Sequence, residues 1–363
     1  SNIVIFHNKH FRKALRKCLL WKITILEYPI VIILKPNVTL KKLAEMLNMS
    51  ISTVSRALKD HPDISKETKE KVRELAEILE YEPNTYAINL RTNNSKEFGV
   101  IVPAISNYFY HSFISSLEEE VRRYGYSLII LQSVDDPEIE LENLKRCKQS
   151  RVAGIFVSIT SKTEDIKPFL KVEDQDIPII FFDKVPAFEA CNKVCVADSL
   201  ATQLAVEALI TKKKKKILAL FGDINLSISN KRLAAFEKEM AKMGSTISYT
   251  IDFANSAKAA SLAFTKALEE SKPDAVFCMS DEILTGVMKV IQKLAIKIPN
   301  DLSIVAISDG FIPQLYFPEI AYAETSGFKL GKLAFSRMMT CMAGNSFVQE
   351  LTIDSVLING GSI

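Results

Sequence analysis

Between residues 39 and 80, hydrophobic positions recur with the period of short α-helices. A residue type that caps helices stands before each of three such stretches, at Thr39, Ser50 and Ser65. Asn48, between the first two stretches, is one of the few residue types that tolerate a left-handed backbone. The apolar positions are Leu40, Leu43, Ala44 and Leu47, then Val54, Ala57 and Leu58, then Val72, Leu75, Ala76 and Leu79. We predict three helices, the first two joined as a helix-turn-helix unit.

From Phe98 onward, short apolar runs alternate with amphipathic helical stretches. The predicted strands are Gly99–Pro103, Ser127–Gln132, Gly154–Ser158, Ile179–Phe182, Val194–Val196, Ile217–Phe221, Ala275–Met279 and Ser303–Ile307. The predicted helices are Phe113–Tyr124, one ending near Ser150, one after Ser158, Ala201–Ile210, one around Lys231–Met243, and Glu282–Ala295. Such alternation predicts an α/β fold with doubly wound parallel sheets, and the length of this region favours two lobes over one.

Three of the predicted strands are followed closely by an aspartate: Asp183, Asp281 and Asp309. Binding sites in doubly wound sheets lie at the carboxyl ends of the strands, so these positions are candidate ligand contacts. Each aspartate could instead cap the helix or turn that follows it. Several of them converging on one cleft would favour a polyol or another hydroxyl-rich ligand, because carboxylates accept hydrogen bonds from hydroxyl groups.

Composition is that of an ordinary globular chain, with 48% hydrophobic and 25% charged residues among 363. The net charge is +3, but residues 1–37 hold seven Lys or Arg and one acidic residue, Glu27, so the remainder of the chain is acidic overall. The run Lys212–Lys216 falls in a predicted loop and is interpreted as a solvated charge cluster. A nucleic-acid function therefore has to be argued from particular side chains.

Residues 1–37 copy the basic-then-apolar order of a signal peptide, but Lys22, Glu27 and Pro29 interrupt the apolar run and no small-residue cleavage site follows. We interpret them as an N-terminal extension, either an artefact of a start codon placed too early or a basic arm that contacts DNA. The six cysteines have no C-x-x-C spacing and histidines are few. We expect a cytoplasmic protein with reduced thiols, no metal site, no cofactor and no membrane partner.

The head and the two predicted lobes together resemble the lactose-repressor (LacI/GalR) family from Val38 to the C-terminus. The residues that carry the resemblance are Val38–Glu45 and Ser50–Leu58 in the head, Tyr81–Asn84 with Ala87 and Leu90 in the hinge, and Phe98–Pro103, Ile105–Phe109, Arg151–Ile155 and Asp301–Val305 in the core. The resemblance implies a transcription regulator, most simply a repressor, whose affinity for operator DNA is modulated by a small molecule, a sugar or sugar derivative. Its core would be a two-lobed domain similar to periplasmic binding proteins.

The resemblance also implies how the chain is divided. A helix-turn-helix DNA-binding domain would span 38–82, a hinge helix and linker 83–96, and an effector-binding and dimerisation domain 97–363. Lobe 1 would comprise about 97–196 and 326–352, and lobe 2 about 197–325 and 353–363. The chain ends at Ile363 without a leucine heptad, so we expect a homodimer on a pseudo-palindromic operator rather than a tetramer.

For DNA reading, the resemblance places Ile51 and Ser52 at the first exposed positions of the recognition helix, with Arg56 one turn later. Arg56 can bridge a guanine edge or a phosphate, and Ile51 can offer only apolar contact, for example to a thymine methyl group. Ile51 could instead belong to the core. In the hinge, Leu90 would enter the minor groove. The DNA-binding residues predicted are Thr39, Ser50, Ile51, Ser52, Thr53, Ser55, Arg56, Asn84, Ala87 and Leu90.

For the effector, the resemblance places Arg232 and Asp309 as polar anchors with Asp183 and Asp281 beside them. Ser280 stands where Asn is frequent in the family and Thr325 where Gln is frequent, so the ligand can differ from the familiar ones. The effector-binding residues predicted are Asn107, Tyr108, Phe109, Asp183, Arg232, Phe253, Asp281, Asp309 and Thr325.

Two other classes of function compete with the regulator. A solute-binding protein of the same two-lobed fold would lack the head and carry a cleavable signal, which is the opposite of this chain. An enzyme would also be compatible with doubly wound sheets. The sequence contains no G-x-G-x-x-G, G-x-x-x-x-G-K-[ST] or G-x-S-x-G motif, and its few histidines lie away from the aspartate-bearing strand ends. We therefore predict no enzymatic activity.

Overall fold

The computed structural model describes residues 38–82, 95–344 and 347–363. Its contacts divide the chain into two units, Ser1–Asn84 and Thr85–Ile363, which we call the head and the core and describe separately. The predicted hinge residues Asn84, Ala87 and Leu90 and the N-terminal extension lie outside the described residues.

The described part of the head consists of α2 (Leu40–Leu47), α3 (Ile51–Leu58) and α4 (Lys66–Ile78). The side chains of Thr39, Ser50 and Ser65 each accept a hydrogen bond from the backbone N–H three residues on, so all three predicted caps are present. Asn48 ends α2 with φ of 53°, the left-handed backbone expected of it. The buried core of the head is Leu43, Ala44, Val54, Ala57, Val72 and Ala76.

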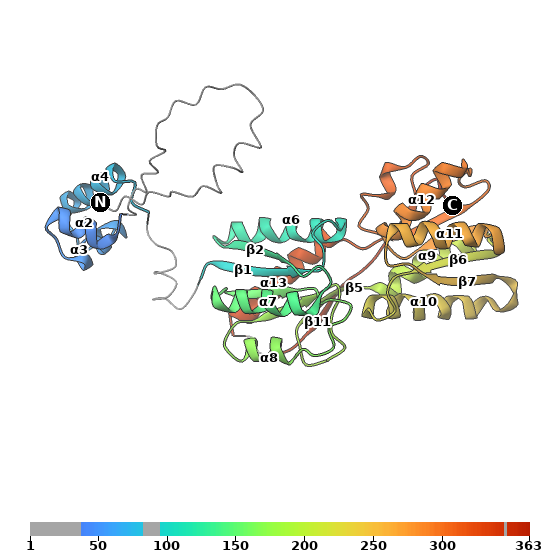
Figure 1. Ribbon diagram of the computed structural model, residues 1–363, viewed down its shortest axis with the longest axis horizontal. Helices are drawn as coiled ribbons and strands as arrows, with labels where there is room; N and C mark the ends of the chain where they lie inside the picture. The colour runs from blue at the N-terminus through green and yellow to red at the C-terminus, as the bar shows by residue number, and fades with distance from the viewer. Residues whose placement is uncertain (1–37, 83–94, 345–346) are drawn as a thin grey trace, which may run out of the picture. The chain divides into compact units, whose positions relative to one another are not determined.

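The core contains, within the described residues, two six-stranded sheets (Figure 1). Sheet 1 comprises β1 (Glu97–Val102), β2 (Ser127–Gln132), β3 (Gly154–Val157), β4 (Ile179–Phe182), β5 (Lys193–Val196) and β11 (Glu350–Ile353). Sheet 2 comprises β6 (Lys216–Phe221), β7 (Ser248–Phe253), β8 (Ala275–Cys278), β9 (Ser303–Ser308), β10 (Ala321–Glu324) and β12 (Leu357–Ile358).

The strand order is β11-β5-β4-β3-β1-β2 in sheet 1, where every neighbouring pair is parallel. In sheet 2 the order is β12-β10-β9-β8-β6-β7, and only the short β12 runs antiparallel to its neighbour. The predicted fold class is confirmed: a helix-turn-helix head is followed in the sequence by two doubly wound parallel α/β lobes.

Helices cover both faces of sheet 1. Successive residues of its strands point to opposite faces, so neighbouring residues pack into different clusters. Val100 and Val102 pack in one cluster with α6 (Tyr108–Arg123) and α13 (Gly327–Met342). Ile101 packs in a second cluster with α7 (Pro137–Gln149) and α8 (Lys167–Glu173). Sheet 1 and these four helices form lobe 1.

Helices α6 and α13 approach each other closely. A Cβ atom added at Gly331 would lie 2.7 Å from the carbonyl oxygen of Phe113, and one added at Gly327 would lie 2.5 Å from that of Phe109. Both distances are shorter than van der Waals contact, so a side chain at either glycine would push the helices apart. Glycine at these two positions therefore permits the packing that joins the start of lobe 1 to a helix from much later in the chain.

Lobe 2 is formed by sheet 2 and two pairs of helices that pack on each other. The first pair is α9 (Asp198–Thr211) with α10 (Ser227–Met243), and the second is α11 (Ala257–Glu270) with α12 (Asp281–Leu294). Two short 3₁₀ turns, η1 (Gly244–Thr246) and η2 (Pro313–Leu315), join elements of this lobe. Lys212, Lys213, Lys215 and Lys216 are exposed where α9 turns into β6, as the sequence predicted for the lysine run.

The chain passes between the two lobes three times. It leaves lobe 1 after β5, returns after β10, and leaves again between β11 and β12. Each lobe is therefore built from segments far apart in the sequence. Among the helices of the described ranges, none has both the length and the hydropathy needed to span a membrane.

One predicted helix begins earlier than expected. Helix α6 starts at Tyr108 rather than at Phe113, because Asn107 caps it by accepting a hydrogen bond from the N–H of Phe109 at 2.9 Å. Tyr108 and Phe109, which the resemblance assigned to a pocket loop, are the first two residues of this helix. The end of the pocket loop and the start of α6 are thus set by one side chain.

Candidate functional site

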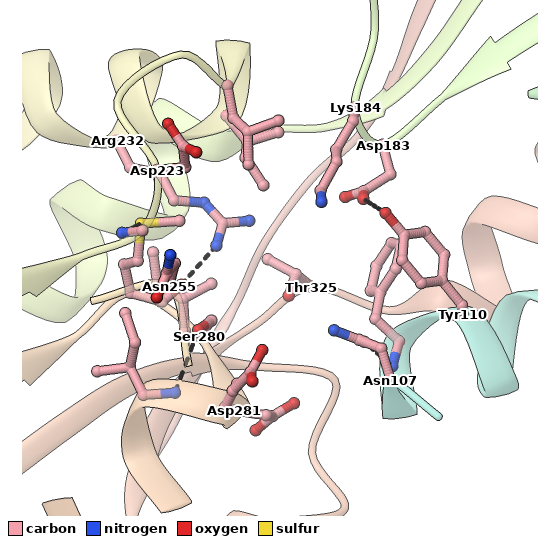
Figure 2. A pocket seen from close by; sticks show the side chains of 18 of the residues that line it. Asn107, Tyr110, Asp183, Lys184, Asp223, Arg232, Asn255, Ser280, Asp281 and Thr325 are labelled. Atoms are coloured by element: carbon pink, nitrogen blue, oxygen red, sulfur yellow. Dashed lines mark hydrogen bonds between the residues drawn. The ribbon is translucent and has the colours of Figure 1, made fainter. Parts of the chain in front are cut away.

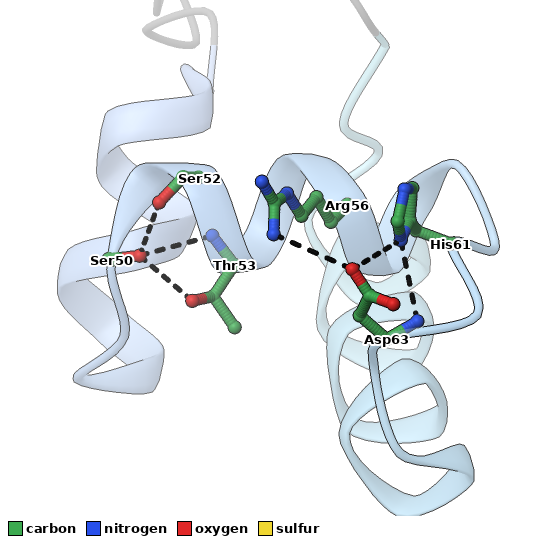
Figure 3. Close-up of polar contacts among 6 residues, drawn as sticks. All are labelled: Ser50, Ser52, Thr53, Arg56, His61 and Asp63. Carbon is green, nitrogen blue, oxygen red and sulfur yellow. Dashed lines mark hydrogen bonds and ion pairs between the residues drawn. The ribbon is translucent and has the colours of Figure 1, made fainter.

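The N-terminus of α3 is held by a cluster of hydroxyl groups around Ser50 (Figure 3). Ser50 Oγ accepts a hydrogen bond from the N–H of Thr53 at 3.1 Å. It also lies 2.7 Å from Ser52 Oγ and 2.8 Å from Thr53 Oγ1. Since these groups satisfy one another, they fix the start of the predicted recognition helix while leaving Ser50 and Ser52 exposed.

One face of α3 is buried and the other is open. Val54 and Ala57 are completely buried in the head, whereas Ile51 keeps 47% of its surface exposed. Ser52 and Arg56 are also exposed, and Ser55 is partly exposed. Ile51 therefore lies outside the head's core, which removes the alternative left open by its spacing from Val54.

Arg56 is held only weakly within the head. Its Nη1 atom lies 3.9 Å from Asp63 Oδ2, and both side chains are more than half exposed. Asp63 Oδ2 also lies 3.3 Å from Nδ1 of His61, as Figure 3 shows. An exposed ion pair at this distance contributes at most about 1 kcal/mol. Arg56 can therefore exchange Asp63 for a phosphate or a base edge at little cost.

The core contains a cavity of about 270 Å³ where the carboxyl ends of strands from both sheets meet (Figure 2). The lining residues follow the strands of both lobes, as expected for doubly wound sheets. They are Asn107, Phe109, Tyr110, Asp135, Ser161, Asp183 and Lys184 from lobe 1 and its loops, and Gly222, Asp223, Leu226, Ile228, Arg232, Ala254, Asn255, Met279, Ser280, Asp281, Glu282, Ile283, Ile307, Ser308, Asp309 and Thr325 from lobe 2.

Arg232, on α10, is fixed from behind. Its Nε and Nη2 atoms lie 2.8 and 2.7 Å from Asp198 Oδ1, and Nη1 donates to the carbonyl oxygen of Met279 at 2.5 Å. The side chains of Arg232 and Asp198 are only 7% and 2% exposed. Their mutual contact stabilises both charges away from water, and it leaves the guanidinium in one orientation at the cavity wall.

Asp183 lies in lobe 1, directly after β4, with a left-handed backbone of φ 56°. Its Oδ2 atom accepts a hydrogen bond from the hydroxyl of Tyr110 at 2.7 Å, and that hydroxyl also lies 2.9 Å from Ser158 Oγ. Figure 2 shows the Asp183 carboxylate and Tyr110 side by side at the cavity wall. Burial raises the pKa of Asp183 above its ordinary value.

In lobe 2, Asp281 and Asp309 share one corner of the cavity. Asp281 accepts hydrogen bonds from Ser308 Oγ at 2.5 Å and from the N–H of Asp309 at 3.3 Å. Asp309 Oδ1 accepts a hydrogen bond from the N–H of Gly327 at 2.6 Å, which links lobe 2 to the first residue of α13 in lobe 1. Burial raises the pKa of Asp281 and raises that of Asp309 to about 6.

Two loops of lobe 1 are joined by carboxylates at the edge of the cavity. Asp135 accepts hydrogen bonds from the N–H and the hydroxyl of Ser161 at 2.9 and 2.5 Å. Next to them, the buried Glu140 accepts hydrogen bonds from the N–H of Thr160 at 2.8 Å and from the hydroxyl of Thr163 at 2.7 Å. Burial raises the pKa of Glu140 to about 7.

The structure brings most of the predicted effector-binding residues to this one cavity. Those that line it are Asn107, Phe109, Asp183, Arg232, Asp281, Asp309 and Thr325. Tyr108 and Phe253 do not line it. The first turn of α6 directs Tyr108 onto Phe311, with ring centroids 5.1 Å apart, and Phe253 ends the edge strand β7 with 45% of its surface exposed.

Sequence reasoning missed several lining residues, among them Tyr110, Asp135, Lys184 and Asn255. Asp135 and Asn255 follow closely after β2 and β7, so the rule that sites lie at strand ends would have found both had it been applied to every strand. Lys184 is next to Asp183 in the sequence. Tyr110 carries no local signal, because its contact with Asp183 joins residues far apart in the chain.

Metal ligands are not grouped in the part of the chain that the structure describes: no three or more His, Cys, Asp or Glu side chains there are arranged to hold an ion. The polar groups of the cavity are instead those that hydrogen-bond a small organic ligand, namely carboxylates, amides, hydroxyls, an ammonium and a guanidinium. The site is thus suited to binding.

Relatives of known function share this organisation. Over 304 residues the chain is 26% identical to the HTH-type transcriptional repressor PurR of Vibrio atlanticus (strain LGP32), an alignment that spans 83% of this chain and 91% of that protein. It is 27% identical over 326 residues to catabolite control protein A of Priestia megaterium, spanning 89% of this chain and 96% of that protein. Both alignments cover most of this chain and nearly all of the relative.

The fold also matches a solved structure. The crystal structure of the lac repressor dimer bound to operator and the anti-inducer ONPF covers 90% of this chain and 99% of its own, with a TM-score of 0.80 at 21% sequence identity. A family model for bacterial regulatory proteins of the lacI family matches residues 39–84, and a model for periplasmic binding proteins and the sugar binding domain of the LacI family matches residues 95–358. Since these two models together span the head and nearly all of the core, the chain belongs to the LacI family of DNA-binding transcription regulators.

Proposed function

We propose that this regulator binds a pseudo-palindromic operator as a homodimer and represses transcription from it, and that a sugar or sugar derivative in the core cavity changes its affinity for the operator. The observation that carries the proposal is the open face of α3, where Ile51, Ser52 and Arg56 are exposed on a helix whose start is fixed by Ser50. Exposed, pre-positioned side chains of this kind read base edges in the major groove.

Each of the three side chains has a distinct role on DNA. Arg56 donates to guanine O6 and N7 or to a phosphate, Ser52 hydrogen-bonds a base edge, and Ile51 contacts a thymine methyl group. Thr39 caps α2 and is exposed, so it is available to a phosphate. The family resemblance adds Asn84, Ala87 and Leu90 of the hinge, with Leu90 as the wedge in the minor groove at the centre of the operator.

The chemistry of the cavity supports a hydroxylated effector. Asn107, Thr325 and Asn255 supply neutral donors and acceptors, and the carboxylates and Arg232 supply charged ones. Sugar hydroxyl groups donate to carboxylates and accept from a guanidinium or an amide. The cavity volume of about 270 Å³ limits the effector to a small molecule.

Contacts between the lobes provide a route from the cavity to the rest of the core. Asp309 bonds the N–H of Gly327, and Lys231 on α10 lies 3.3 Å from Glu350 on β11. A ligand that changes the relative position of the lobes must change these contacts. Linkage then requires that operator and effector alter each other's affinity by the same factor.

The proposed dimer is supported by an exposed apolar group on lobe 2. Phe317 is 99% exposed and Leu315, in η2, is 61% exposed. Side chains of this size are seldom left fully exposed on a monomer. A second copy of the chain would cover them, and sedimentation equilibrium of a Phe317→Ser variant tests this by showing whether the dimer dissociates.

Selection of bound sequences from a random DNA pool by the full chain tests the function. We expect enrichment of a palindrome, with lower affinity and relaxed base preference at one position of each half-site in Arg56→Ala. Arg122→Ala is the matched control, because Arg122 is a 72% exposed arginine on α6 of the core. If the wild-type chain enriches no sequence even at low salt, or if Arg56→Ala enriches the same sequence with equal affinity, the proposal is wrong.

A further inference from the structure

The charge of the cavity is strongly unbalanced. Six of its lining residues are acidic and two are basic. The acidic residues are Asp135, Asp183, Asp223, Asp281, Glu282 and Asp309, and the basic ones are Lys184 and Arg232. The cavity is therefore formally negative, whatever ligand enters it.

The charge of Arg232 is already compensated inside the protein. Asp198 lies behind the cavity wall and approaches the guanidinium at 2.7 Å, with both side chains almost fully buried. A buried pair of this geometry has little remaining charge to offer a ligand, although the N–H groups of Arg232 can still donate hydrogen bonds. Lys184 is then the one cation of the lining that is not neutralised by an ion pair with a described residue.

Three carboxylates in the cavity have no cation in direct contact, although Lys184 and Arg232 act on Asp183, and Arg232 on Asp281, from farther away. Asp183, Asp281 and Asp309 form hydrogen bonds, but within the described ranges none of them forms an ion pair with Lys, Arg or His. Asp183 is 8% exposed, and its second oxygen, directed into the cavity in Figure 2, has no hydrogen-bond partner among the described side chains and backbone groups. Buried carboxylates are rare unless a cation is paired with them, so the lack of an ion-pair partner at these three carboxylates points to a charge that the ligand supplies.

Asp281 and Asp309 are the best placed of the three for a single cation. The N–H of Asp309 donates to Asp281 Oδ2, so the two residues lie at the same corner of lobe 2. Glu282, which follows Asp281 in the sequence, also lines the cavity. Figure 2 shows Lys184 and Arg232 on one side of the cavity and Asp281 on the other. Burial raises the pKa of both carboxyl groups, and the attraction of Arg232 offsets this only in part at Asp281.

We infer that the effector carries a positively charged amino group as well as hydroxyl groups, and that this ammonium binds between Asp281 and Asp309. The inference rests on the proposed function and names its ligand class: an aminated sugar or polyol. An ammonium in this corner would supply the charge that the carboxylates lack and donate hydrogen bonds to both of them. A sugar acid or a sugar phosphate would instead meet the repulsion of the surrounding carboxylates.

Titration calorimetry with matched compounds tests the inference on the full chain at neutral pH. Each set shares one carbon skeleton in a neutral, an aminated and an acidic form: glucose, glucosamine and glucuronate, the corresponding galactose and mannose sets, and sorbitol, 1-amino-1-deoxysorbitol and gluconate. We expect at least one aminated compound to bind tenfold or more tightly than its neutral counterpart, and the acidic forms to bind more weakly than either.

Two variants locate the ammonium. Asp281→Asn keeps the size of the side chain but removes its charge, and we expect it to reduce the preference for the aminated compound to threefold or less. Glu269→Gln, at an exposed position of α11, removes the same charge away from the cavity and should leave the preference unchanged. A preference that survives in Asp281→Asn overturns the inference.

The inference is also overturned if a neutral or acidic form binds most tightly, or if no aminated compound binds at all. Operator binding by the same preparation, measured without any effector, separates this failure from failure of the proposed function. A chain that binds its operator but prefers a neutral or acidic effector contradicts only the inference, whereas a chain that binds no operator contradicts the proposed function.

Discussion

The head and the core both use an arginine at a candidate binding surface, and they hold it in opposite ways. Arg56 is 58% exposed and 3.9 Å from its acidic neighbour, whereas Arg232 is 7% exposed and 2.7 Å from its own. The first can move to whichever phosphate or base edge it meets. The second has one orientation before any ligand arrives. The contrast teaches that adaptability suits a long, repetitive partner such as DNA, and pre-organisation suits a small one.

The carboxylates compared between the two regions also differ in exposure, and their pKa values shift in opposite directions. In the head, Asp60 is exposed beside Lys69 and Arg73, and hydrogen bonding and attraction to Lys69 lower its pKa. In the core, burial raises the pKa of Glu140 and Asp309. Asp60 is therefore stabilised as a charged group by neighbouring cations, whereas burial disfavours the charged forms of Glu140 and Asp309.

The largest expected effect comes from removing the fixed arginine. Arg232→Ala leaves Asp198 buried without its cation, and we expect the core to lose about 3 to 5 kcal/mol of stability, as for other broken buried pairs. Urea unfolding followed by circular dichroism measures this. The double variant Arg232→Met with Asp198→Leu should recover most of the loss, and a loss below about 1 kcal/mol in the single variant would show that the pair is not stabilising.

The next largest effect is on the pH dependence of stability, which should differ between the core and the head. Glu140 has a pKa of about 7 in the folded core and 4.5 as its ordinary value, so the folded state takes up a proton first as the pH falls. Core stability should therefore rise between pH 8 and pH 4.5, by up to about 3 kcal/mol from this residue. Asp60 acts in the opposite direction: its lowered pKa means that the head loses stability below about pH 4.

Urea unfolding of the full chain across this pH range checks the sign. Glu140→Gln should reduce the rise between pH 8 and pH 4.5, to which the raised pKa of Asp309 also contributes, and Glu269→Gln, an exposed change on α11, should leave the rise unchanged. A core that becomes less stable as the pH falls from 8 to 6 would contradict the assignment.

A smaller effect is expected on operator affinity. Arg56→Ala should weaken operator binding by about 1 to 3 kcal/mol, because one base or phosphate contact is lost in each half-site. Its effect on folding should be within about 0.5 kcal/mol, since the ion pair it breaks is exposed. Fluorescence anisotropy measures the operator affinity, and urea unfolding measures the stability. If Arg56→Ala lost as much stability as Arg232→Ala, Arg56 would not be the loosely held arginine described above.

The smallest effect concerns the cap of α3. Ser50→Ala removes the acceptor for the N–H of Thr53, and we expect a loss of about 1 kcal/mol in the stability of the head. Ser55→Ala, a serine within the same helix that caps nothing, is the control. Equal losses in both variants, measured by urea unfolding, would mean that the hydroxyl cluster does not stabilise the start of the helix.

The head could be predicted in detail from the sequence because its signals are local. The three caps and the left-handed Asn48 are each set by residues within four positions, and all are present. Most strands of the core were predicted for a similar reason. Helices α11 and α13 and strands β7, β10, β11 and β12 were not predicted. In α13, Gly327 and Gly331 weaken the helical pattern and serve a packing contact with α6 that no local pattern reveals.

The cavity could be predicted only in part. Asp183, Asp281 and Asp309 stand at strand ends, where a local rule applies. The contact of Tyr110 with Asp183 and that of Asp135 with Ser161 depend on how the lobe folds in three dimensions. The resemblance placed Phe253 in the lining, but β7 is an edge strand and leaves that ring exposed at its end.

The path of the chain through the lobes has a consequence for synthesis on the ribosome. Strand β11 completes the edge of sheet 1 and β12 that of sheet 2, and Ser362 bonds the backbone of Ala321 and Ile304. Neither lobe can close its sheet until these segments have left the ribosome. The two lobes should therefore mature together, once these segments have emerged, rather than one after the other, and the head is the unit able to fold before them.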